Sequence, residues 1–532
     1  MSERPLGAQI SHMLKSRGVD VIFGIPGVHN QEMYRGIEEA GITHILARHE
    51  QGAGFMADGY ARASGKPGVA YVITGPGLCN IMTPMGQAYS DSVPMLVISS
   101  CLDETAARRG QLHQMRDQRA AAAMVCDWSE EARSPQAAYQ LIDRALVEFE
   151  TQRARPKHIQ VPIGALVAAA PPPPPPSHTD MLGTPEWDGH AVRKIALALR
   201  QSKHPLFVLG GGAVEGGTLW DKLLHATGAA VFTSYAGRGC VSPDYPLSFG
   251  SYLARPDTPE VFAQADLVIV VGSELAEVDL WKDHLGHNCP MIRVDIDPAT
   301  LISDGHPASE QHIGDAYRTF EAVYSELADH RARTHWNPDQ VAAIRARWRA
   351  QTDAERPGIV PVCDALRAAV PPDTMIYSDM TQFAYVAKEV WDMDRPGHWH
   401  HPYGFGTLGY ALPAAIGGAV ARKGRPTVAI AGDYGFQFTV QELGAAVELG
   451  LPLPIIIWDN GKLGEIEDGM VRAQIAPNAV VQRNPDFIML AKAYGAYAAA
   501  PESLDALQKD VKQALTADRP TVIHVRSDIV AG

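Results

Sequence analysis

The chain has 532 residues, of which 46 are Lys or Arg and 60 are Asp or Glu, giving a formal net charge of −14. This acidic balance argues against a general nucleic-acid binder, because neutralising phosphates requires clustered Lys and Arg. No apolar run approaches the roughly 18 to 20 residues that span a bilayer, and the first residues lack a signal-peptide pattern. With 46% hydrophobic residues, the sequence predicts a multidomain cytoplasmic α/β enzyme.

The first part of the chain alternates between short apolar strands and helices. We expect strands at 19–23, 42–46, 69–74 and 95–99, and a helix over 51–63. Compact apolar runs of this kind suit strands that are buried on both faces of a parallel sheet. Six prolines at 171–176 favour an extended spacer, so we expect a linker over 171–187. A docking site for a proline-binding partner is the alternative.

The same alternation continues to the end of the chain. We expect strands at 205–209 and 266–271, then at 427–431 and 455–458 around a helix over 439–449. Three doubly wound parallel sheets are the simplest account, in domains at 1–170, 188–332 and 345–532. The glycine-rich turn at 210–216 lacks the full dinucleotide fingerprint, so a nicotinamide-dependent dehydrogenase is only a remote alternative.

Two strands of the last part end in polar residues that suit a cation. One leads into Gly432-Asp433, and the next ends in Asp459-Asn460-Gly461. In a right-handed βαβ unit both ends reach the same edge of the sheet, where Asp433 and Asn460 could supply hard oxygen ligands to Mg²⁺. The helix N-terminus after Gly435 could hold an anion. On spacing alone, however, a turn or a helix cap is the more common explanation.

The segments Gly432-Asp433-Tyr434-Gly435 and Asp459-Asn460-Gly461-Lys462 resemble the thiamine diphosphate motif. The resemblance implies thiamine diphosphate anchored by Mg²⁺ or Ca²⁺, with the metal bound by Asp433, Asn460 and the main-chain carbonyl of Lys462. Two positions depart from the motif. Tyr434 replaces a glycine, which affects the backbone contact to the diphosphate. Asp459 replaces an asparagine, but it should not touch the metal because Asn460 is the ligand position.

The first part resembles the pyrimidine-binding domain of the acetolactate synthase and 2-oxo acid decarboxylase superfamily. The matching motifs lie at 24–27, 48–50, 57–62 and 74–80, and the resemblance covers nearly the whole chain. It implies that Glu50 hydrogen-bonds the aminopyrimidine and promotes formation of the carbon nucleophile. It also implies a homodimer or homotetramer, because in relatives this glutamate reaches the cofactor from the neighbouring subunit. Leu408 matches the bulky position that bends the cofactor. Taken alone, Glu50 would be an ordinary acidic residue at a helix N-terminus.

Two histidines are candidates for handling substrate. His29 stands where benzaldehyde lyase-like enzymes carry a histidine. His113, followed by Gln114, matches a position that is histidine in pyruvate decarboxylases and glutamine in synthases and lyases. Either histidine could protonate the enamine carbon or hold the carboxylate, although a hydrogen-bonded surface histidine is the commoner case. FAD is not expected, because residues 272–277 replace the Arg-Phe-Asp-Asp-like segment of flavin-containing synthases.

The resemblance therefore predicts thiamine diphosphate- and Mg²⁺-dependent decarboxylation of a small 2-oxo acid, with release of an aldehyde or ligation to a second carbonyl compound. Acetolactate synthase without functional FAD is the alternative, and a non-catalytic cofactor-binding protein is another because of Tyr434. Segments 27–29, 50–57 and 112–118 are most similar to 5-guanidino-2-oxopentanoate decarboxylases. A guanidinium substrate needs a carboxylate partner. Glu465, Glu467 and Asp468 are candidates, although a solvated helix face is the commoner explanation for them. No membrane partner is expected.

The predicted site residues fall into three sets. The catalytic set is Glu50, His29, His113 and Gln114; the cofactor-binding set is Glu50, Gly432, Asp433, Tyr434, Gly435, Leu408 and Asn460; the metal ligands are Asp433, Asn460 and Lys462.

Overall fold

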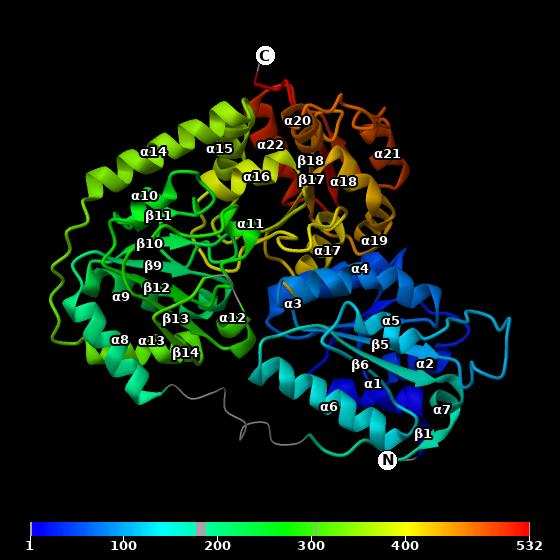
Figure 1. Cartoon of the computed structure of the whole chain (residues 1–532). Coiled ribbons are helices and arrows are strands. Elements are labelled where there is room, and N and C mark those ends of the chain that lie inside the picture. Colours follow the sequence, from blue (N-terminus) through cyan, green and yellow to red (C-terminus); the bar gives the residue numbers. More distant parts are fainter. Residues whose placement is uncertain (1–2, 177–187, 304–305, 531–532) are drawn as a thin grey trace. The chain divides into compact units, whose positions relative to one another are not determined.

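The computed structural model describes residues 3–176, 188–303 and 306–530, and three parallel sheets form its framework (Figure 1). The chain divides into two compact units. The first contains Met1–Leu182, Thr374–Thr381 and His401–Ile529, and the second contains Gly183–Asp373, Gln382–His400 and Val530–Gly532. The predicted fold class, three doubly wound parallel sheets, is confirmed.

The N-terminal sheet of the first unit has the strand order β3-β2-β4-β5-β7-β6, and all its neighbouring strands are parallel. Its central strands are buried along their whole length, as their apolar sequences predict. The strands are β2 (Val21–Gly24), β3 (Thr43–Leu46), β4 (Gly68–Val72), β5 (Met95–Cys101), β6 (Trp128–Glu131) and β7 (Lys157–Pro162). The other elements are β1 (Arg4–Pro5), α1 (Leu6–Ser16), α2 (Gln31–Glu39), α3 (Glu50–Ser64), α4 (Pro76–Ser90), α5 (Gln118–Ala123), α6 (Pro135–Thr151), α7 (Ile163–Val167) and β8 (Ala169–Ala170).

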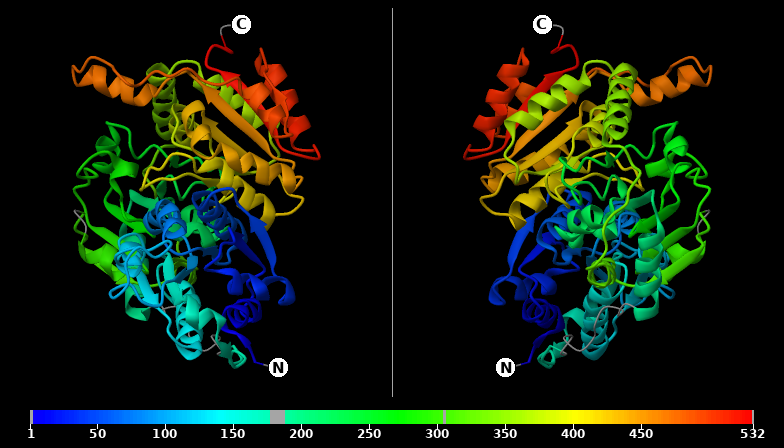
Figure 2. Two further views of the ribbon diagram at one scale, coloured as in Figure 1. Left: turned by 90° about the vertical axis from the view of Figure 1, so that its right-hand side faces the viewer. Right: turned by 90° about the vertical axis from the view of Figure 1, so that its left-hand side faces the viewer.

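The C-terminal sheet of the first unit contains the parallel series β15-β17-β18-β20-β19. These strands are β15 (Met375–Ser378), β17 (Thr427–Gly432), β18 (Pro454–Asp459), β19 (Tyr497–Ala499) and β20 (Thr521–Arg526). The accompanying helices are α17 (Ala411–Ala421), α18 (Asp433–Phe438), η3 (Val440–Glu442), α19 (Leu443–Glu448), α20 (Gly464–Arg472), α21 (Phe487–Ala493) and α22 (Leu504–Ala514). Both views of Figure 2 show α20, in orange, projecting away from the sheet that precedes it. Its residues Ile466 and Val471 are correspondingly exposed.

The second unit is built on the parallel sheet β11-β10-β9-β12-β13-β14. The glycine-rich turn after β9 forms the short 3₁₀ helix η2 (Gly211–Gly216). A Cβ at Gly210 or Gly212 would run into the backbone of Gly272, so these glycines allow the ends of β9 and β12 to approach each other.

The strands of the second unit are β9 (Pro205–Leu209), β10 (Ala230–Thr233), β11 (Ser248–Gly250), β12 (Leu267–Val271), β13 (Met291–Asp295), β14 (Glu310–Ile313) and β16 (Trp399–His400). Its α-helices are α8 (Gly189–Gln201), α9 (Leu219–Thr227), α10 (Thr258–Phe262), α11 (Glu277–Leu280), α12 (Pro298–Ser303), α13 (Ala316–Glu326), α14 (Pro338–Glu355), α15 (Ile359–Ala369) and α16 (Gln382–Val390). This unit therefore continues past residue 345, where the sequence predicts that the last domain begins.

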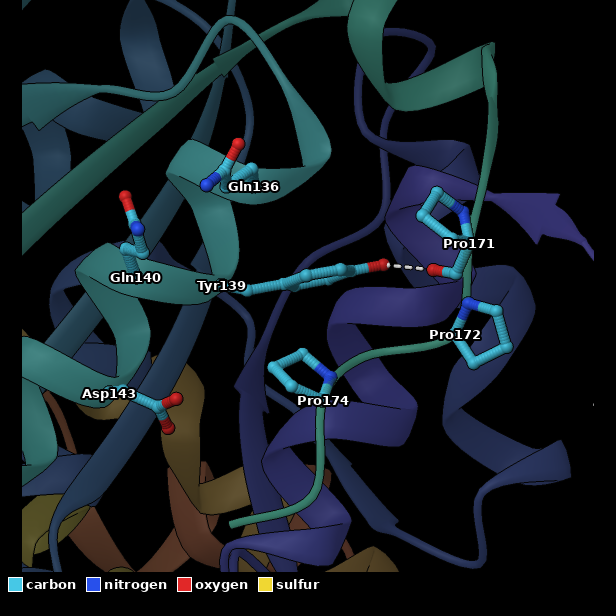
Figure 3. Close-up of a pocket in the computed structure, with 7 residues that line it drawn as sticks. All are labelled: Gln136, Tyr139, Gln140, Asp143, Pro171, Pro172 and Pro174. Carbon is cyan, nitrogen blue, oxygen red and sulfur yellow. Dashed lines mark hydrogen bonds between the residues drawn. The ribbon is translucent and has the colours of Figure 1, made fainter. Parts of the chain in front are cut away.

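The proline run is anchored to the domain that it follows. Tyr139 donates its hydroxyl to the carbonyl of Pro171 at 2.7 Å (Figure 3). Arg17 donates to the carbonyl of Pro174 at 2.9 Å. Tyr139 and Asp143 also line a pocket of about 350 Å³ beside these prolines. The first residues of the predicted linker are thus a docked extended segment, because their carbonyls accept hydrogen bonds from side chains. Residues 177–187 of the predicted linker lie outside the described residues.

Helices α3 and α17 cross closely and join the two sheets of the first unit (Figure 1). A Cβ at Gly59 would overlap the carbonyl oxygen of Ala414, and one at Gly417 would overlap that of Met56. One hydrophobic core accordingly runs from the N-terminal sheet through both helices into the C-terminal sheet. Across the part of the chain that the structure describes, no helix is long and apolar enough to cross a membrane.

We expect Gly59→Ala to lower the free energy of unfolding by about 2 kcal/mol or more, because the new methyl group meets backbone that cannot move aside. The matched control is Gly469→Ala in α20, where the only atom near an added Cβ lies 3.9 Å away. That change should be neutral or stabilising by up to about 1 kcal/mol. Urea unfolding measures both, and equal effects of the two substitutions would contradict the close crossing.

Candidate functional site

Glu50 lies at the carboxyl edge of the N-terminal sheet, where α3 begins four residues after β3 ends. Its side chain is buried, with the residue 9% exposed, and Asn80 donates to its carboxylate at 2.9 Å. His49 caps the helix by accepting the backbone N–H of Gln51 at 3.1 Å. The sequence therefore fixes a carboxylate in a buried position at the start of a helix, held by a single side-chain amide.

The two predicted histidines meet beside this carboxylate. The rings of His29 and His113 lie 5.0 Å apart between centroids, and His113 Nδ1 lies 3.0 Å from the carbonyl oxygen of Thr74. Burial lowers the pKa of His29, and the neighbouring His113 lowers it further. His113 has a φ of 63°, a left-handed conformation that a non-glycine residue adopts at a cost.

The turn after β4 brings His113 and Glu50 to one place. A Cβ at Gly75 would overlap the carbonyl oxygen of His113, and a Cβ at Gly77 would lie 3.4 Å from a carboxylate oxygen of Glu50. The amide of Gln114, in contrast, is engaged in its own loop. It donates to the carbonyls of Thr105 and Arg108 and accepts the N–H of Gln111. Gln114 therefore holds the loop that carries His113.

The second cluster lies where β17 and β18 end. Asp433 is 2% exposed, and burial raises the pKa of its carboxyl. Asn484 donates to Asp433 at 2.6 Å and to Asp459 at 2.9 Å. Burial opposes ionisation of Asp459, but hydrogen bonds from His524 and from the N–H of Gly461 lower its pKa below the usual value. Asp459 also contacts Nε2 of His524, which lies 2.7 Å away.

The groups of this cluster fit a hard cation. Asp433 offers a buried carboxylate, and the negative charge of Asp459 lies close to it. Burial and this repulsion both raise the pKa of Asp433, and a bound cation would offset both effects. The Oδ1 of Asn460 accepts the N–H of Lys462 at 3.2 Å, which places the third predicted ligand in the same turn. One carboxylate, one amide and one carbonyl suit Mg²⁺. Among the described residues no group of three His, Cys, Asp or Glu side chains could hold a metal, but this oxygen set does not require one.

The departures from the motif are accommodated locally. Tyr434 follows Asp433 in the first turn of α18 and is not among the described residues with a positive φ, so its backbone does not require glycine. Gly435 does need to be small, because a Cβ there would lie 2.9 Å from the carboxylate of Asp379. Asp379 also accepts the N–H of Gly409, which follows Leu408, at 2.9 Å. Burial raises the pKa of Asp379 to about 6.

Glu442 connects the diphosphate-motif segment with the segment that carries Glu50. Its carboxylate accepts the N–H groups of Arg48 at 3.0 Å and His49 at 2.9 Å. The side chain is fully buried, and this burial raises its pKa to about 7, with Glu50 adding to the effect. Sequence reasoning missed Glu442, Asp379, Asn484 and His524. Their positions carried no motif signal except for Glu442, which lies close to the diphosphate motif.

Three sequence families match the chain in order. The thiamine pyrophosphate enzyme N-terminal TPP binding domain matches residues 4–121, the central domain matches 192–323, and the C-terminal TPP binding domain matches 379–525. The chain belongs to the thiamine pyrophosphate enzymes. The predicted family is therefore confirmed, and each of the three matches falls on a different one of the three sheets.

The chain is similar along its length to curated members of this family. It is 41% identical to the probable 2-ketoarginine decarboxylase AruI of Pseudomonas aeruginosa, over 98% of this chain and 93% of the relative. It is 27% identical to the acetolactate synthase isozyme 1 large subunit of Escherichia coli, over 99% and 94%. It is 26% identical to a probable acetolactate synthase large subunit of Methanococcus aeolicus, over 97% and 90%. The chain is thus related to an enzyme of the subgroup that its N-terminal segments resemble, 2-ketoarginine being 5-guanidino-2-oxopentanoate.

Glu442 should give the stability of the protein a measurable pH dependence. Its pKa of about 7 in the folded state exceeds its ordinary value of 4.5, so the stability it contributes is present below pH 4.5 and is lost as the pH rises through 7. Glu442→Gln removes this titration. Between pH 5 and 8 the wild type should therefore lose about 2 kcal/mol more than the variant in urea unfolding. Glu448→Gln, which removes the exposed carboxylate paired with Arg48, is the control and should follow the wild type. Parallel pH profiles for wild type and Glu442→Gln would contradict this assignment.

Proposed function

We propose that the protein is a thiamine diphosphate- and Mg²⁺-dependent decarboxylase of a 2-oxo acid. The observation that carries the proposal is the pairing of buried Glu50 with Asn80 beside two histidines. The same chain holds a buried Asp433 directly after β17 and Asn460 directly after the neighbouring strand β18. Bound thiamine diphosphate supplies a carbon nucleophile and an electron sink, which is the chemistry that decarboxylation of a 2-oxo acid needs. The chain supplies the proton transfers and the anchoring.

Glu50 would share a proton with a ring nitrogen of the cofactor, since its carboxylate is buried and otherwise meets one amide donor. Asp433, Asn460 and the carbonyl of Lys462 would hold the metal that binds the diphosphate. His113 and His29 would hold the substrate carboxylate and deliver a proton to the product carbon. Burial and the neighbouring His113 lower the pKa of His29, which favours the neutral ring of His29. Aldehyde release is the proposed outcome, and ligation to a second carbonyl compound is the alternative suggested by the acetolactate synthase relatives.

We further propose that the active unit is a homodimer or a homotetramer built from two dimers. In this arrangement Glu50 of one subunit would serve the cofactor held by Asp433 of another, as the family resemblance implies.

The proposed substrate class is a 2-oxo acid that ends in a guanidinium group. The relative named as a 2-ketoarginine decarboxylase supports this class. On α20, Glu467 pairs with Lys462, whereas Glu465 lies 3.6 Å from the guanidinium of Arg472. Because Arg472 is a largely exposed side chain, a substrate guanidinium could take its place on Glu465. We therefore propose Glu465 as the carboxylate that recognises the substrate.

Replacing Glu50 with Gln tests the proposed chemistry. With cofactor and Mg²⁺ present, CO₂ release from a panel of 2-oxo acids should fall by at least about 100-fold, because the proton at the cofactor is no longer exchanged. Cofactor binding, measured by the quenching of tryptophan fluorescence, should be retained. The control is Glu38→Gln, which changes an exposed glutamate on α2. Unchanged turnover in Glu50→Gln would overturn the proposal, and product masses separate aldehyde release from ligation.

Replacing Glu465 with Gln tests the substrate class separately. KM for 5-guanidino-2-oxopentanoate should rise about tenfold, since a charge-assisted pair is lost. The value of kcat/KM for 2-oxopentanoate, which lacks the guanidinium group, should change less than about twofold. Asp468→Gln is the control on the same helix. If both substrates are affected equally, Glu465 does not recognise the guanidinium group.

A further inference from the structure

One peptide group beside His113 makes two hydrogen bonds of opposite polarity. Its carbonyl, from Thr74, lies 3.0 Å from Nδ1 of His113, and its N–H, from Gly75, donates to Oε1 of Gln118 at 2.8 Å. Carbonyl and N–H of one peptide point in opposite directions because the group is planar and trans. Whatever holds the N–H of Gly75 therefore also determines which atom of the peptide faces His113.

Gln118 is itself fixed in orientation. The residue is 7% exposed, and its Nε2 donates to the carbonyl of Ser100 at 2.9 Å and to the hydroxyl of Ser99 at 3.0 Å. A carbonyl oxygen can only accept, so the NH₂ group must face Ser100 and the amide oxygen must face Gly75. Rotating the amide by half a turn would place two donors together and two acceptors together.

The hydrogen-bonded residues that hold Gln118 in place stay uncharged over a wide pH range. Ser99 also contacts Nε2 of His158 at 2.8 Å, and Ser129 contacts Nδ1 of the same ring at 2.7 Å. Burial lowers the pKa of His158 to about 3, so this histidine does not titrate near neutral pH. The network reaches the carboxylate of Glu131 through Gln160, and no hydrogen bond links Gln118 directly to Glu131 among the described residues.

Without Gln118 the peptide would be easy to reorient. Gly75 has a φ of 71° and a ψ of −102°, a region open to glycine because it has no Cβ. The N–H and hydroxyl of Thr74 contact the Ser100 hydroxyl at 3.0 and 2.9 Å, but these bonds lie on the preceding side of Thr74. They leave the plane of the following peptide to be set by Gly75 and Gln118.

The orientation decides where His113 carries its proton. The Thr74 carbonyl is an acceptor, so Nδ1 of His113 must be the protonated nitrogen and Nε2 of the neutral ring must carry the lone pair. A flipped peptide would present an N–H instead and would move the ring proton to Nε2. We infer that Gln118 is a positioning residue that fixes the tautomer of His113 through the Thr74–Gly75 peptide and so makes Nε2 the atom that exchanges a proton in the reaction. The catalytic part of this inference rests on the proposed function, whereas the tautomer itself does not.

The test is the tautomer of His113, read from the ¹⁵N shifts of its two ring nitrogens in protein labelled with ¹⁵N-histidine and lacking cofactor. His113→Gln assigns the signals. The wild type should show Nδ1–H. Gln118→Met, which removes the hydrogen bond to Gly75 and the other amide hydrogen bonds at similar side-chain length, should show a substantial fraction of Nε2–H. Gln160→Met, whose amide lies 3.3 Å from Gln118 but does not touch Gly75, is the matched control and should resemble the wild type.

Kinetics then link the tautomer to the reaction. In Gln118→Met, kcat should fall at least about tenfold with KM within about twofold, because substrate contacts are kept while proton transfer is impaired. Gln160→Met, the matched control, should keep the kcat and KM of the wild type. The inference would be overturned if the wild type carried Nε2–H, or if Gln118→Met left the tautomer unchanged. The measurement on the wild type does not depend on any variant folding correctly. If the tautomer shifts as expected but no 2-oxo acid is turned over by the wild type, the structural inference stands and the proposed function fails.

Discussion

The contact between α3 and α17 is the constraint on which the candidate site depends. Glu50 is the first residue of α3, and α17 begins three residues after Leu408. Backbone meets backbone at Gly59 and at Gly417, so neither helix can slide or rotate without a clash. The crossing therefore fixes the position of Glu50 relative to the loop that carries Leu408 within the first unit.

A buried charge network fixes the register of this crossing. Arg62 on α3 donates to Asp58 at 2.7 Å and to Asp91 at 2.9 Å, and Tyr410 donates to Asp58 at 2.7 Å. Burial opposes the charge of Arg62, but the carboxylates of Asp58 and Asp91 keep its pKa well above the usual value. Removing one partner would leave the others buried and unpaired, which costs far more than the pair contributes. Such a network favours a single alignment of the two helices.

The sequence predicts the sheets well because their strands are local apolar runs, and the motif residues well because they follow those strands. It fails where a contact joins distant segments. Glu442 bonds the backbone of Arg48, 394 residues earlier, and nothing near Arg48 signals an acceptor. Asn484 bridges Asp433 and Asp459 from a loop without periodicity. The proline run was predicted as a spacer from composition, but its docking depends on Tyr139 and Arg17, whose side chains the composition does not position.

Glycine illustrates why a motif needs a structure before it implies a ligand. Gly59 is required by a helix crossing, and Gly75 by a positive φ beside the carbonyl of His113. Gly210 and Gly212 are required because two strand ends approach each other. Each requirement is satisfied within the chain itself, so a glycine-rich turn after a strand does not by itself indicate a nucleotide. What distinguishes Gly75 is its surroundings. It directly precedes α4, whose Asn80 holds Glu50, and its peptide connects Gln118 to His113. A glycine points to function when the groups that its conformation orients are themselves capable of chemistry.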